Sequence, residues 1–138
     1  MPNRKIFTNL SNFYRPFINR LNVHLAPHNL SNSHWNVMRT LKNEESLTFQ
    51  DIAKANHIEK PSASSLIHKL IASGYVETVE GTDKRSKLVR LTPLGEQVYD
   101  EILHIIDKWL ETLVEGIPEE NKLIVENALE VMIKNLKK

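Results

Sequence analysis

Two neighbouring stretches of the sequence carry hydroxyl and cationic side chains that can bind a polyanion. The first stretch, residues 60–69, supplies the candidate contact residues Lys60, Ser62, Ala63, Ser64, Ser65, His68 and Lys69. The second stretch, residues 83–87, supplies Asp83, Lys84, Arg85 and Lys87. Serine hydroxyls hydrogen bond to base edges and phosphates, and Lys and Arg pair with phosphates. These residue types are therefore candidates for contacts with a nucleic acid.

A helix over residues 61–73 would present the first stretch on one side. Pro61 suits a first helical position, and Gly74 suits the left-handed residue that ends a helix. At about 100° per residue, the inner face holds Ala63, Leu66, Ile67, Leu70 and Ile71. The outer face holds Pro61, Ser65, His68, Lys69 and Ala72, with Ser62 and Ser64 at its flanks. A solvated polar face has the same composition, so this helix alone leaves binding and mere solubility equally open.

The segments on either side of this helix favour binding. Thr48 can cap a short helix that runs to about Asn56, and about four residues join it to the helix 61–73, which is the layout of a helix-turn-helix. Two β-prone segments follow, Tyr75–Val79 and Lys87–Leu91, with the second charged stretch between them. A helix-turn-helix followed by such a hairpin is the winged-helix plan. In that plan the helix enters the major groove of DNA and the hairpin tip reaches phosphates or the minor groove.

Long helices flank this central part. An amphipathic helix with an aromatic stripe is predicted from Ile6 to before Ala26, and a second helix starts near Ser31. Thr92 caps a helix that reaches Gly116, and Pro118 opens the last helix. The predicted fold is mainly α (α+β), a winged helix-turn-helix with the order α-α-α-α-β-β-α-α.

Composition excludes several classes of protein. The 138 residues include no cysteine, which excludes disulfides, thiolate metal sites and thiol redox sensing in this chain. No apolar run approaches the roughly 20 residues of a membrane span, and the N-terminus does not resemble a secretory signal. No catalytic motif is present, and His24 and His28 lie on either side of Pro27 with no further metal ligand nearby. We therefore expect a cytoplasmic protein that is not an enzyme and binds no cofactor, metal or membrane.

Charge is distributed unevenly along a chain of net charge +1. Residues 96–138 contain 5 Lys and Arg against 10 Asp and Glu, so the acidic charge is concentrated in the C-terminal third. Residues 1–46 contain 6 Lys and Arg against 2 Asp and Glu. A basic face elsewhere is therefore compatible with a nearly neutral total.

The stretches "LSNSHWNVMRTL", "LTFQDIAKANHIEKPSASSLIHKLIASGYVE" and "DKRSKLVRLTPLG" resemble the multiple-antibiotic-resistance regulators, the MarR family. The resemblance covers Leu30–Gly95 by motif and the whole chain by helix order. It implies a single MarR-type domain over 1–138, with residues 31–92 as the winged helix-turn-helix. It also implies an obligate homodimer, whose helices in 1–26 and 93–138 pair across a two-fold axis, bound to a palindromic operator in double-stranded DNA.

The resemblance also implies roles for single residues. Ser62, Ser64 and Ser65 become groove contacts with Lys69 near phosphate, while Asp83 and Arg85 form the wing tip. This chain departs from the family in three ways. Ser65 stands where many members carry Arg, and Thr78 stands where a basic residue often begins the wing. Its wing is also shorter than usual. We therefore expect the serine-rich helix to supply most of the discrimination between DNA sequences.

Two functional hypotheses remain open at this stage. The first is a dimeric, sequence-specific transcriptional regulator, expected to be a repressor of nearby genes, with release by a small apolar ligand as an open extension. The second is a winged-helix dimer that contacts other proteins and not DNA. A ligand pocket could be lined by Tyr14, Phe17, Trp35 and Met38, but residues at this helical spacing are more often core, and the core interpretation ranks first.

Overall fold

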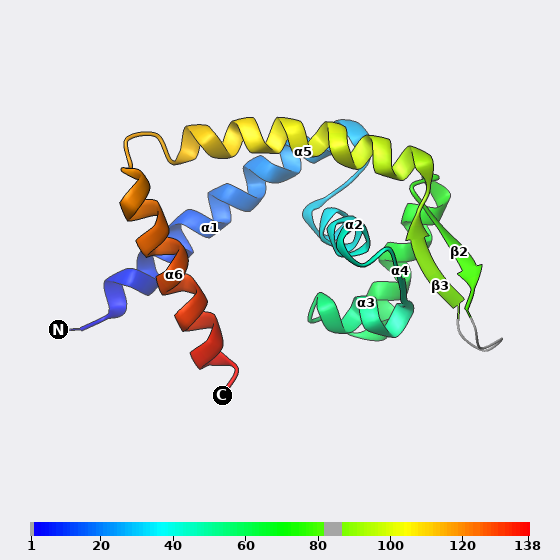
Figure 1. The fold of residues 1–138 in the computed structure, drawn as a ribbon, viewed down its shortest axis with the longest axis horizontal. Helices are drawn as coiled ribbons and strands as arrows, with labels where there is room; N and C mark the ends of the chain where they lie inside the picture. The colour runs from blue at the N-terminus through cyan, green and yellow to red at the C-terminus, as the bar shows by residue number, and fades with distance from the viewer. Residues whose placement is uncertain (1, 82–86) are drawn as a thin grey trace. The chain divides into compact units, whose positions relative to one another are not determined.

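The computed structural model describes residues 2–81 and 87–138. The chain divides into two compact units, Met1–Ile105 and Ile106–Lys138. The elements in order are α1 (Arg4–Leu25), a 3-10 helix η1 (Ala26–His28), α2 (Asn32–Glu44), β1 (Ser46–Thr48), α3 (Phe49–Ala55), α4 (Lys60–Ala72), β2 (Val76–Glu80), β3 (Lys87–Leu91), α5 (Pro93–Leu113) and α6 (Glu119–Leu136) (Figure 1). The predicted fold class is confirmed, and α5 runs from the first unit into the second.

Helix starts lie where the sequence predicts them. The backbone N–H of Ser31 donates to Nδ1 of His34 at 3.2 Å, and the Ser31 hydroxyl lies 2.8 Å from the same nitrogen. His34 thus takes the place of the acid in a capping box at the start of α2. At the start of α3, Thr48 Oγ1 accepts from the backbone N–H of Asp51 at 3.1 Å. Helix α4 begins at Lys60, one residue before the predicted start at Pro61.

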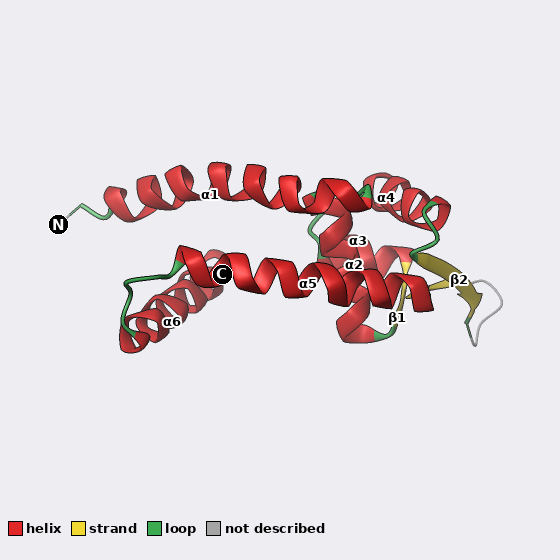
Figure 2. Ribbon diagram, turned by 90° about the horizontal axis from the view of Figure 1, so that it is seen from above, coloured by secondary structure: helices red, strands yellow, loops and turns green. Residues whose placement is uncertain are grey.

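The sheet contains a strand that the predicted order lacks. Strand β1 pairs antiparallel with β3, and β3 pairs antiparallel with β2, so β3 is central. Val89 of β3 stands opposite Leu47 on one side and Thr78 on the other. Ser46–Thr48 therefore adds one strand to the predicted order. Figure 2 shows how little of the chain is strand.

The core of the first unit lies between α2, α3, α4, β3 and the first turns of α5. Its largest fully buried side chains include Met38, Leu41, Ile52, Ile67, Leu70 and Ile102. Trp35 of α2 stacks on Tyr99 of α5 with ring centroids 4.5 Å apart and an interplanar angle of 12°. Lys42 and Asp100 add an ion pair of 3.5 Å between the same two helices. Helix α2 is thus held between the helix-turn-helix and α5.

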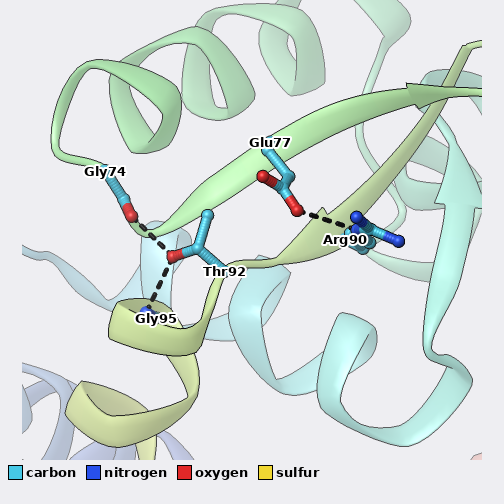
Figure 3. A network of polar contacts seen from close by, with 5 residues as sticks. All are labelled: Gly74, Glu77, Arg90, Thr92 and Gly95. Carbon is cyan, nitrogen blue, oxygen red and sulfur yellow. Dashed lines mark hydrogen bonds and ion pairs between the residues drawn. The ribbon is translucent and has the colours of Figure 1, made fainter.

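The end of the wing and the start of α5 meet in a tight polar junction (Figure 3). The Thr92 hydroxyl donates to the carbonyl of Gly74 at 2.6 Å and accepts from the backbone N–H of Gly95 at 3.0 Å. The backbone N–H of Thr92 donates to the carbonyl of Tyr75 at 3.0 Å. The end of α4, the start of β2 and the first turn of α5 are therefore fixed to one another through a single threonine.

The second unit consists of the end of α5, a turn and α6. Gly116 in the turn has φ +85°, which suits glycine. Helix α6 begins at Glu119, one residue after the predicted start at Pro118, which is the N-cap residue. No side chain of α6 is buried. Within the described part of the chain, no helix has an apolar stretch sufficient to cross a lipid bilayer.

Candidate nucleic-acid interface

Helix α4 turns its polar residues away from the core, as the sequence predicts. Ala63, Ile67 and Leu70 are buried, whereas the exposed residues are Lys60, Pro61, Ser62, Ser65, His68, Lys69 and Ala72. Ser64 is half-buried at the edge of this face. Figure 1 shows α4 beside α2 and α3, with the hairpin following it in the chain. The exposed side chains of Ser62, Ser65, His68 and Lys69 therefore share one accessible helix face.

Ala63 is a candidate contact residue that is buried in the structure. Its exposed fraction is 0%, because it lies on the apolar side of α4 that packs into the core. A methyl group with no exposed surface cannot contact DNA without unfolding the helix-turn-helix. The prediction that Ala63 is a contact residue is wrong, and its helical phase explains why.

The imidazole of His68 contacts an aromatic ring of the neighbouring helix α3. The Phe49 ring, at the start of α3, lies 5.8 Å from the His68 ring, tilted by 52°. This contact restricts the imidazole on the exposed face of α4. No sequence signal links the two, because the pairing depends on the angle at which α3 and α4 pack.

An open groove of about 490 Å³ adjoins the serine face. It is lined by Ser33 of α2, Ile58 of the turn, and Pro61, Ser62, Ser65 and Leu66 of α4. Sequence reasoning brought Ser62 and Ser65 together but missed Ser33. A polar residue in the first turn of a helix carries no signal of its own, and only tertiary packing places it beside α4.

The wing is described up to Gly81 and again from Lys87. The predicted tip residues Asp83, Lys84 and Arg85 lie outside the described residues. Lys87 is exposed at the start of β3, opposite Glu80 of β2. On the neighbouring part of the hairpin, Arg90 Nε donates to Glu77 Oε2 at 2.8 Å (Figure 3). That exposed pair joins the strands and balances the charge of Arg90.

The structure shifts the protonation of His34. Burial, and secondarily the positive charge of Lys69, lower its pKa from the ordinary value of 6.5. The capping bonds of Nδ1 also require a neutral ring, because a protonated nitrogen cannot accept from Ser31. The start of α2 and the cationic part of α4 are therefore electrostatically linked.

The four candidate pocket residues do not share one accessible wall. Met38 is 0% exposed and Trp35 is 4% exposed, because both pack in the core. Tyr14 is 59% exposed on α1, and Phe17 stacks on Phe13 at 5.2 Å. Trp35 and Met38 therefore belong to the core, which is the interpretation that ranked first, and a ligand pocket at these residues stays a prediction.

Comparisons with known proteins agree with this geometry. A model of the MarR family matches residues 28–86. Over 120 residues the chain is 31% identical to YwoH, an uncharacterized HTH-type transcriptional regulator of Bacillus subtilis, and the match covers 87% of this chain and 88% of YwoH. The chain belongs to the MarR family.

Solved structures show the same MarR fold. A Staphylococcus aureus MarR, solved with salicylate and kanamycin, has a TM-score of 0.89 at 24% identity, covering 96% of this chain and 91% of that one. NadR, solved with 4-hydroxyphenylacetate, has a TM-score of 0.76 at 25% identity, covering 92% and 91%. MarR proteins are DNA-binding transcriptional regulators and not enzymes. The family assignment therefore decides for the DNA-binding regulator over the protein-contact module.

Proposed function

We propose that this MarR-family chain acts as a homodimeric repressor that binds a palindromic site in double-stranded DNA. The observation that carries the proposal is the α4 face, where Ser62, Ser65, His68 and Lys69 are exposed together on a helix supported by a wing. Each subunit inserts one α4 into a major groove. A two-fold dimer then requires half-sites about 10 bp apart, centre to centre, or a multiple of that spacing.

Exposed apolar side chains support the dimer. On α1 they are Ile6, Phe7, Leu10, Phe13, Tyr14 and Val23, and on α6 they are Leu123, Ile124, Val125, Val131, Ile133 and Leu136. Large exposed apolar side chains in such numbers favour an interaction site on each helix. We assign its burial to a second copy of the chain, through residues 1–26 and 93–138.

The dimer is tested by sedimentation of three variants. Phe7→Asp and Val131→Asp place a charge in the exposed apolar surfaces and are expected to shift the protein toward monomer. Asn127→Asp, also exposed on α6, is the matched control and keeps the dimer. Dimers that persist in both apolar variants would contradict the assigned interface.

DNA binding is tested with a duplex selected from a random library by the wild-type protein. The selected sequences are expected to be palindromic, and the affinity should fall steeply between 50 and about 200 mM salt, because binding releases counterions from phosphates. Repression is measured with the selected site placed in a reporter promoter. A protein that enriches no sequence and shows no salt-sensitive binding would contradict the proposal.

The wing tip is tested by Arg85→Ala on the same duplex. We propose that Arg85 contacts the DNA backbone or minor groove and that Asp83 holds it in place, so the variant should weaken binding to all sequences about equally. Lys84→Ala serves as the comparison, since it removes the same charge from the adjacent position. Equal affinity of Arg85→Ala and wild type would remove the wing tip from the interface.

We also propose that a small aromatic ligand weakens DNA binding. The support comes from NadR, which was solved with 4-hydroxyphenylacetate and is 25% identical to this chain. The test measures affinity for the selected duplex with and without 4-hydroxyphenylacetate. An unchanged affinity at millimolar ligand would exclude this compound as the effector and leave the DNA-binding proposal intact.

A further inference from the structure

The groove between α2 and α4 extends the DNA-binding face onto a helix that the winged-helix plan does not use for base contacts. We propose that Ser33 of α2 is a backbone contact, which holds a phosphate of the DNA strand whose bases α4 reads. This inference rests on the proposed function, because the groove is continuous with the α4 face. It adds a residue that neither the sequence motifs nor the family assignment identifies.

Ser33 is placed beside the α4 serines by the packing of two helices. Its side chain lines the same groove as Ser62 and Ser65, and both Ser33 and those two serines are exposed. A DNA strand that contacts Ser62 and Ser65 therefore passes the hydroxyl of Ser33. Three hydroxyl donors from two helices then converge on one open groove.

The chemistry of the groove suits one sugar-phosphate unit. Hydroxyls donate to the non-bridging oxygens of a phosphate, and such contacts fix the register of the protein on the duplex. The remaining wall is apolar, made by Ile58, Pro61 and Leu66, and it can pack against a deoxyribose. None of these six lining side chains carries a formal charge, so nothing on the wall itself repels a phosphate.

The position of Ser33 is fixed before any ligand arrives. The residue before it, Asn32, donates its backbone N–H to Asn22 Oδ1 of α1 at 2.7 Å. The residue after it, His34, is bonded to Ser31 through the capping box. A hydroxyl carried by so constrained a turn loses little conformational entropy on binding.

The test uses substitutions of Ser33 that are expected to change the affinity for DNA and the stability of α2 in opposite directions. Ser33→Asp puts an acid in the first turn of α2, which favours the helix, yet it should weaken DNA binding about tenfold or more through repulsion of the phosphate. Ser33→Lys disfavours the helix slightly, yet it should strengthen binding at low salt. It should also steepen the salt dependence of log affinity by about 0.9.

Asn43→Asp and Asn43→Lys are the matched controls. Asn43 is exposed on the same helix, ten residues after Ser33 and so about 15 Å along the axis. That separation exceeds the screening length of about 8 Å at physiological salt, so these variants should leave the affinity within about twofold of wild type. Thermal unfolding of all four variants shows that each one is folded.

The phosphate itself is located by replacing single phosphates of the selected duplex with neutral methylphosphonates. At one position in each half-site, the replacement should abolish both the loss of affinity caused by Ser33→Asp and the gain of affinity caused by Ser33→Lys. If wild type binds the duplex but the Ser33 variants match the Asn43 variants, Ser33 is not a contact and the proposed function stands. If wild type binds no duplex, the proposed function fails first.

Discussion

The carbonyl oxygen of Tyr75 occupies the space that a side chain on Gly95 would need. A Cβ built on the Gly95 backbone lies 1.9 Å from that oxygen and 2.8 Å from the carbonyl carbon. No real Cβ approaches a backbone atom so closely, so the first turn of α5 can lie against the start of β2 only if residue 95 is glycine. The spacing from Thr92 to Gly95 in "LTPLG" thus has a packing reason.

Gly95→Ala should destabilise the protein by about 3 kcal/mol or more, because the obstacle is backbone and cannot rotate away. The measurement is urea unfolding followed by circular dichroism. Gly116→Ala is the control, because it also replaces a glycine but creates no steric clash. Nothing lies within 4 Å of the added Cβ, and only the φ of +85° is unfavourable for alanine. That control should cost about 1 kcal/mol. Equal losses at the two positions would contradict the packing argument.

Thr92→Val should cost about 1–3 kcal/mol, because it removes both hydrogen bonds of the hydroxyl while keeping the shape of the side chain. The bonds lost are those to the Gly74 carbonyl and from the Gly95 N–H. Thr92→Ser keeps the hydroxyl and should retain most of the stability. If the free energy of unfolding were the same for the valine and serine variants, the junction would depend on packing and not on these bonds.

Stability should fall on acidification through His34. Its pKa is lower in the folded than in the unfolded state, so below about pH 6.5 the unfolded chain binds more protons. The stability that the neutral His34 contributes is fully present above pH 6.5, and it is lost as the pH falls toward the lower pKa of the folded state. The slope from this one group is at most about 1.4 kcal/mol per pH unit.

His34→Gln isolates this contribution, because glutamine can accept the Ser31 N–H in a capping box without titrating. The difference between wild type and variant, measured by urea unfolding from pH 7.5 to 5, should shrink steadily as the pH falls. The rest of the chain is identical in the two proteins, so its contributions to the pH dependence of stability cancel in the difference. A difference that stays constant with pH would contradict the role of His34.

Glu45→Gly should stabilise the protein by about 1 kcal/mol. Glu45 ends α2 with φ 65° and ψ −58°, a backbone conformation that a residue with a Cβ adopts only under strain. Its side chain is exposed, so the substitution relieves strain without opening the core. Glu45→Ala is the comparison, since it removes the charge and keeps the strain, and it should leave the melting temperature close to that of wild type.

Lys69 and Ser65 should affect DNA binding in different ways. Lys69→Gln should weaken binding to all sequences and reduce the salt slope by about 0.9, because one phosphate contact is lost. Ser65→Ala should alter base preference and leave the slope unchanged. Both are measured by titration of the selected duplex and its single-base variants at three salt concentrations. A change of slope in Ser65→Ala would reassign that serine to the backbone.

The sequence was most informative where a structure depends on a few adjacent residues. Caps at Ser31, Thr48 and Thr92 were predictable because each satisfies backbone N–H groups within its own first turn. The outward face of α4 followed from helical geometry alone. The same geometry argued against Ala63, whose inclusion among the contacts was an error of assignment.

Features that depend on distant partners were not predictable. Strand β1 has only three residues, too few for an alternating pattern, and it forms because β3 offers an edge. The contribution of Ser33 to the groove and the contact of Phe49 with His68 depend on packing angles between helices. Trp35 and Met38 carried a pattern common to cores and pockets, and only their burial separates the two.

The hydroxyl of Tyr75 donates to the carbonyl of His28 at 2.9 Å, across 47 residues of chain. Ser46 of β1 likewise pairs with Arg90 of β3, which lies 44 residues later in the chain. Contacts between such distant segments slow folding, because a long loop must close before they contribute energy. During synthesis, the helix-turn-helix therefore leaves the ribosome before the strand and tyrosine that complete its surroundings. Strand β1 can therefore pair with β3 only after the whole wing has been synthesised.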